Sequence, residues 1–146
     1  MAASAQTATD SVKPLTDSDI QLLRSDVQAD KNDIITHTMK FSDAESTAFW
    51  PLYRKFANAQ QVIGDNRVQL IKDYAASYDH MTAMKATNLM QRWFRIEDQT
   101  LALRKTYWPK FVKALGAKRA AKFYQVDNRL SLMINVQLTD NIPLIP

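Results

Sequence analysis

The stretch from Phe41 to Ser77 reads FSDAESTAFWPLYRKFANAQQVIGDNRVQLIKDYAAS, and its apolar pattern decides the fold class. Ser42 followed three residues later by Glu45 predicts a capping box, which holds the first turn of a helix. After this start the apolar residues recur at alternating steps of three and four, as on the buried face of a helix. They are Phe49, Leu52, Phe56, Ala59, Ile63, Leu70, Tyr74 and Tyr78. The pattern predicts one helix roughly 50 Å long, at 1.5 Å rise per residue.

Gly64 is the weakest point of this predicted helix, because Gly64-Asp65-Asn66 is also a sequence that forms turns. A glycine inside a helix costs about 1 kcal/mol relative to alanine, which a long helix tolerates. The apolar pattern resumes in phase at Leu70. We therefore favour a continuous helix, with a break at Gly64 as the alternative.

Three other places combine an apolar residue with a helix-capping type, and helical periodicity follows each of them. They are Leu15-Thr16, Met81-Thr82 and Leu115-Gly116. We expect an all-α, elongated fold of four helices, in which residues 43–79 and 83–115 form a long, kinked antiparallel hairpin. One helical domain is expected over residues 15–141. It lies between a flexible N-terminal arm, 1–14, and an apolar tail with two prolines, 142–146.

Two similar elements place a Trp-Pro pair inside this helical pattern, at Trp50-Pro51 and at Trp108-Pro109. A proline within a helix removes one hydrogen bond and bends the helix. Both pairs lie equally far from Asp79, so an antiparallel hairpin that turns there brings them side by side. We expect them to be the structural kinks of the hairpin, which would give it a concave face.

The composition excludes several classes of protein. The chain has 146 residues, no cysteine and two glycines. Without cysteine it has no disulfide framework, thiolate metal site or cysteine nucleophile. So few glycines argue against sandwiches and barrels, which need many tight turns. No stretch approaches the roughly 20 apolar residues of a membrane span, so none is expected.

The net charge of +4 is unevenly distributed along the chain. Residues 1–46 carry eight acids and four bases, whereas residues 47–146 carry seven acids and fifteen bases. The hairpin register also places Asp73 level with Lys85, as a surface ion pair. Basic residues that we consider for binding an acidic or unfolded polypeptide are Arg54, Lys55, Arg104, Lys105, Lys110, Lys113, Lys118, Arg119 and Lys122. A merely solvated basic face is the alternative, and no nucleic-acid-binding signature accompanies these residues.

Three methionines gather near the predicted hairpin tip: Met81, Met84 and Met90. Methionine is pliable and suits surfaces that accept varied apolar partners, although it also fills ordinary cores. The chemistry of an enzyme is not evident. His37 and His80 lack a second histidine one turn away, and no glycine-rich phosphate loop occurs. We expect no enzyme, no cofactor and no metal site.

The first residues allow two interpretations. Ala3-Ser4-Ala5 has the small-x-small form found at a signal-peptidase cut, so the chain is either an exported protein in nearly mature form or one with an ordinary small-residue tail. We favour export to the periplasm. An ordinary small-residue tail, the alternative, would say nothing about where the protein is located.

The helix openings resemble a known motif, Leu-Thr-x-x-Gln. Leu15-Thr16 keeps its first two positions, Phe41-Ser42 followed by Glu45 keeps its shape, and Leu115-Gly116 is a looser version. With the long hairpin and the absence of cysteine, the chain resembles the Spy/CpxP-like LTxxQ family of periplasmic proteins. The resemblance implies a homodimer whose basic, apolar, concave surface holds unfolded or partner polypeptides, as an ATP-independent chaperone or envelope-stress adaptor. The alternatives are a structural or accessory subunit that binds one protein and, less favoured, a nucleic-acid binder.

Overall fold

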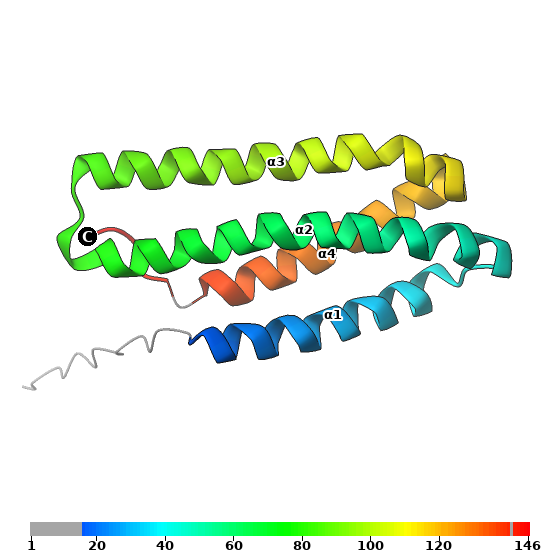
Figure 1. Ribbon diagram of the computed structural model, residues 1–146, viewed down its shortest axis with the longest axis horizontal. Coiled ribbons are helices and arrows are strands. Elements are labelled where there is room, and N and C mark those ends of the chain that lie inside the picture. The colour runs from blue at the N-terminus through cyan, green and yellow to red at the C-terminus, as the bar shows by residue number, and fades with distance from the viewer. Residues whose placement is uncertain (1–15, 141) are drawn as a thin grey trace, which may run out of the picture.

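The computed structural model describes residues 16–140 and 142–146, and over these residues it is all-α with no strand (Figure 1). The expected fold class is confirmed. The helices are α1 (Asp17–Met39), α2 (Asp43–Ser77), α3 (Ala83–Leu115) and α4 (Ala117–Thr139), with a short 3-10 turn at Tyr78–His80. α2 runs without a break through Gly64, as favoured. The expected arm, 1–14, lies outside the described residues.

Local signals account for the helix ends. Ser42 and Glu45 form the predicted capping box: the Ser42 backbone N–H donates to Glu45 Oε1 (3.1 Å) and the Glu45 N–H donates to Ser42 Oγ (3.2 Å). Thr82 Oγ1 accepts from the Lys85 N–H (3.2 Å) and begins α3. Gly116 alone joins α3 to α4, and its φ of 79° is a conformation that favours glycine. This one-residue turn reverses the chain sharply.

The four helices extend along the long axis of the molecule, and α2 and α3 form the expected antiparallel hairpin (Figure 1). α4 packs on α3 and then continues beside α1. α1 and α2 follow one another in sequence, yet their Cα atoms stay more than 8 Å apart. The neighbouring helices α2 and α3, α3 and α4, and α1 and α4 are therefore closely packed, whereas α1 and α2 lie farther apart.

The core lies at the end of the bundle opposite the hairpin tip. Phe123 of α4 meets Phe111 of α3 (ring centroids 4.8 Å apart) and Phe49 of α2 (4.9 Å). Ile35 and Met39 from α1 are buried in the same cluster. Burying each such side chain contributes about 1.5–3 kcal/mol, so this cluster supplies much of the stabilisation that joins all four helices.

The two Trp-Pro elements lie at one level of the hairpin, because Phe49 contacts Phe111 (5.7 Å between centroids). Their indole rings face different neighbours. Trp50 packs edge-on against Tyr53 (5.5 Å), whereas Trp108 packs on Tyr124 (5.4 Å). Pro51 and Pro109 are exposed, and both helices continue past them.

The expected ion pair between Asp73 and Lys85 is wrong. Asp73 pairs with Arg92 (2.7 Å), and Lys85 Nζ donates to the carbonyl oxygen of His80 (3.3 Å). The turn of the hairpin includes the 3-10 segment and two further residues, so the chain reverses later than at Asp79. The partner of Asp73 therefore lies farther along α3.

We expect Phe123→Ala to lower the free energy of unfolding by about 3–5 kcal/mol, because it leaves a cavity where three helices meet. Phe94→Ala, at an exposed position of α3, is the matched control and should cost less than about 1 kcal/mol. Urea unfolding followed by circular dichroism measures both. Equal losses in the two variants would contradict this location of the core.

Candidate functional site

Most of the basic residues that the sequence singled out extend into solvent. Lys110 is one of these, with its Nζ 4.8 Å from the centroid of the Tyr107 ring. The exposed members are Arg54, Lys55, Lys105, Lys110, Lys113, Lys118 and Lys122. They remain available for an acidic partner, whereas the other two members, Arg104 and Arg119, are held within the fold.

Arg119 fastens the start of α4 to the turn between α1 and α2. Its guanidinium pairs with Glu45, in the first turn of α2, and its Nη2 donates to the carbonyl oxygen of Met39 (2.7 Å), the last residue of α1. The Ser42 backbone N–H and then Arg119 hold the pKa of Glu45 below its ordinary value. This pairing gives Arg119 a structural role, which its sequence pattern did not indicate.

Arg104 joins α3 to α4 in a similar way. Its Nη2 donates to Asn128 Oδ1 (3.4 Å), and its backbone carbonyl accepts from the Tyr124 hydroxyl (2.6 Å). Arg104 is half-buried, so it is less available to a partner than the neighbouring Lys105.

The outer side of α3 carries an exposed apolar face that the sequence analysis did not single out. Met90, Phe94 and Leu101 are spaced four and seven residues apart and therefore share one side of the helix. With Trp93 they are between 42% and 56% exposed. We call these four residues the α3 face. Only Phe94 indicated this exposed face in the sequence, because it is an aromatic residue that directly follows Trp93 and is out of phase with the buried positions.

One edge of the α3 face is fixed by polar contacts. Glu97 accepts from Trp93 Nε1 (3.1 Å) and forms an ion pair with Arg67 of α2 (2.9 Å). These contacts orient the Trp93 indole on the surface. Met90, the one member of the face that the sequence analysis named, is 42% exposed, so it does not fill the core.

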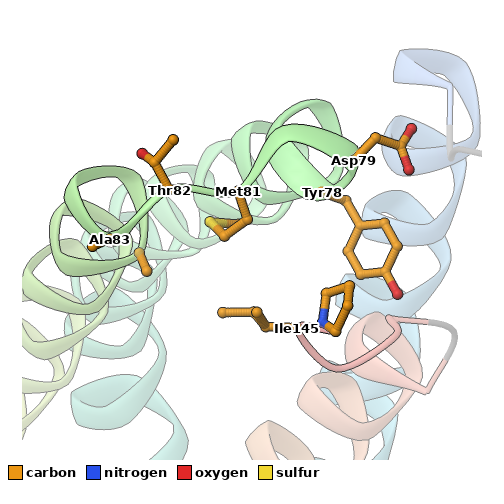
Figure 2. Close-up of a pocket in the computed structure, with 8 residues that line it drawn as sticks. Tyr78, Asp79, Met81, Thr82, Ala83 and Ile145 are labelled. Atoms are coloured by element: carbon orange, nitrogen blue, oxygen red, sulfur yellow. The ribbon is translucent and has the colours of Figure 1, made fainter.

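The hairpin tip holds a second apolar feature, a cavity of about 460 Å³ between the turn and the end of the chain. Figure 2 shows the Met81 side chain and Ile145 directed toward the same space, with Tyr78 beside them and Asp79 directed away. The Tyr74 hydroxyl holds the tail by donating to the carbonyl oxygen of Pro143 (2.6 Å). The apolar tail thus docks on its own chain, and Met84 beside the turn is 83% exposed.

A buried polar cluster lies between α1, α2 and α4. Gln60 Nε2 donates to both carboxylate oxygens of Asp127 (3.2 and 3.0 Å), and Lys31 is buried close enough to interact electrostatically with Asp127. Burial raises the pKa of Asp127, an effect that the charge of Lys31 opposes. Burial likewise lowers the pKa of Lys31, and Asp127 opposes that change. Sequence periodicity alone gave no sign of this charged pair in the interior.

The described part of the chain shows no group of three or more His, Asp or Glu side chains that could hold a metal ion. His37 lies on the surface, with its Nδ1 2.9 Å from the carbonyl oxygen of Asp33. A search of the described helices for a segment long and apolar enough to cross a membrane found none.

Comparisons of the chain with protein-family models, curated proteins and solved structures found no match. The resemblance to the LTxxQ family therefore stays a prediction. The geometry provides three surfaces: the α3 face, the tip cavity with its docked tail, and the exposed basic residues nearer the aromatic core.

We expect the pH dependence of stability to reveal the buried carboxyl. Because the folded state raises the pKa of Asp127 above 3.8, it binds this proton more tightly than the unfolded chain does. The stabilisation is complete below pH 3.8 and is lost as the pH rises through the folded-state pKa. The unfolding free energy of the wild type, relative to Asp127→Asn, should therefore fall from acid toward neutral pH.

Urea unfolding at a series of pH values measures this difference. Asp30→Asn removes an exposed carboxylate from α1 and is the control for net charge. A difference between wild type and Asp127→Asn that grows with pH would contradict the assignment.

Proposed function

We propose that this protein is a non-catalytic polypeptide-binding protein of the periplasm, which acts as an ATP-independent chaperone or envelope-stress adaptor. The observation that carries the proposal is the α3 face. Four large apolar side chains lie exposed on one helix, and exposed apolar patches of this kind are typical of surfaces that bind proteins.

The docked tail supports a polypeptide as the ligand. Residues 142–146 have no regular secondary structure, are apolar and include two prolines, and they pack against the hairpin tip by one hydrogen bond and by side chains such as Ile145. An apolar segment of another protein without regular secondary structure offers the same groups. Met81 and Met84 adapt to such segments without a fixed geometry.

The exposed lysines supply long-range attraction. On α4, Lys118, Lys122 and Arg129 share the outer face with Met133 and Val136 farther along the helix. Cations on this face draw in acidic chains, and the apolar residues then hold them. We propose that a homodimer presents these surfaces. Light scattering of the purified protein tests that stoichiometry, and a monomer at working concentrations would remove the dimer from the proposal.

We expect Phe94→Gln to raise the amount of protein needed to suppress aggregation of a reduced client by roughly tenfold. One large apolar side chain contributes about 1.5–3 kcal/mol when buried, and 1.4 kcal/mol corresponds to tenfold. Val62→Gln, at an exposed apolar residue of α2, is the matched control and should leave suppression unchanged.

Light scattering during client aggregation gives the readout, and thermal unfolding verifies that both variants fold. No suppression by the wild type at equimolar concentration would contradict the chaperone role. Retention of a single protein on the immobilised chain would then favour an accessory subunit with one partner.

A further inference from the structure

The open side of the bundle contains a groove of about 270 Å³ between α1 and α2. We call it the α1–α2 groove. Its principal lining residues are Gln28, Asn32, Trp50, Tyr53, Arg54 and Asn58. It lies between different helices from those that form the α3 face and the tip cavity, so it is a separate site from these two surfaces.

The lining is polar and nearly free of charge. Carboxamides dominate it, two from α1 and two from α2, since Gln61 adds to those of Gln28, Asn32 and Asn58. Gln28 Nε2 donates to Asn32 Oδ1 (3.3 Å), which leaves the Asn32 amino group to face other partners. A surface of this kind offers both donors and acceptors.

A buried tyrosine closes the bottom of the groove. Tyr53 is only 2% exposed, and burial raises the pKa of its hydroxyl to about 12, so it stays protonated. A hydrogen bond from the Gln28 side chain opposes this rise in the pKa. The groups that the groove presents to a ligand are therefore the carboxamides and Arg54.

The charges around the groove favour an anion. Arg54 is the one charged residue in the lining and makes no ion pair within the part of the chain that the structure describes. Lys31 lies buried behind the groove and interacts electrostatically with Asp127. Asp127 also accepts a hydrogen bond from Gln60. A free guanidinium binds a carboxylate through two parallel hydrogen bonds.

We propose that the α1–α2 groove binds a small polyhydroxylated carboxylate, that is, a sugar acid. Carboxamides both donate to and accept from hydroxyl groups, and Arg54 takes the carboxylate. Trp50, which is half-buried, adds aromatic surface against which the C–H groups of a sugar ring pack. The volume is at the small end of ligand sites, as a single sugar ring requires.

Isothermal titration calorimetry of the full chain tests the proposal with four probes. D-glucuronate and D-galacturonate carry both hydroxyl groups and a carboxylate, D-glucose carries hydroxyl groups alone, and acetate carries a carboxylate alone. At least one uronate should bind more tightly than glucose and acetate by roughly tenfold or more, as expected for a charge-assisted pair added to the hydroxyl contacts.

Arg54→Gln should weaken uronate binding to the level of glucose. The matched control is Lys55→Gln, which removes the same charge from the next exposed residue, outside the groove lining, and should bind as the wild type does.

Absence of binding by both uronates at millimolar concentration would show a groove filled by water alone and would overturn the proposal. Equal weakening by Arg54→Gln and Lys55→Gln would overturn it as well, because the effect would then come from net charge. Aggregation suppression by the wild type, measured separately, does not depend on any of these outcomes.

Discussion

The contact between Phe49, Phe111 and Phe123 is the interaction on which the rest of the fold depends, because each ring comes from a different helix. All three rings are fully buried, and Ile35 of α1 packs into the same cluster. Arg119 closes this end of the bundle by joining α4 to the α1–α2 turn. The hydrophobic contact supplies most of the stabilisation of the folded state. The ion pair and hydrogen bonds of Arg119 orient the helix ends relative to one another.

Toward the hairpin tip the same long helices lose this core. No described residue of α2 beyond Phe56 is buried, and α3 buries only Ile96 before it reaches Phe111. The two helices are joined there by ion pairs such as Asp73 with Arg92, and exposed ion pairs contribute little each. The α3 face and the tip cavity lie in this half, and regions with few buried contacts open most easily. Under the proposed function, this lower local stability would help the α3 face to adapt to varied polypeptides.

The candidate surfaces were only partly predictable from the sequence. Met90 was considered for binding from the sequence and is 42% exposed, whereas Phe94 and Leu101 were not singled out. Helical periodicity shows which residues share a side of a helix, but it does not show which side a neighbouring helix covers. Arg119 illustrates the converse. It belongs to a run of basic residues, yet its partners, Glu45 and Met39, come from a turn more than 70 residues earlier. The α1–α2 groove was also hidden, since it depends on how far two helices separate.

The sequence by itself determined the four helices, because apolar spacing and caps such as Ser42 with Glu45 act over a few residues. It also predicted that the two Trp-Pro elements lie at one level of the hairpin, where Phe49 contacts Phe111. Only the tertiary structure decided the partner of Asp73, the burial of Lys31 with Asp127, and the gap between α1 and α2. These depend on the exact length of the turn and on the volume of the aromatic side chains between helices. Such effects are summed over the whole bundle and leave no local pattern in the sequence.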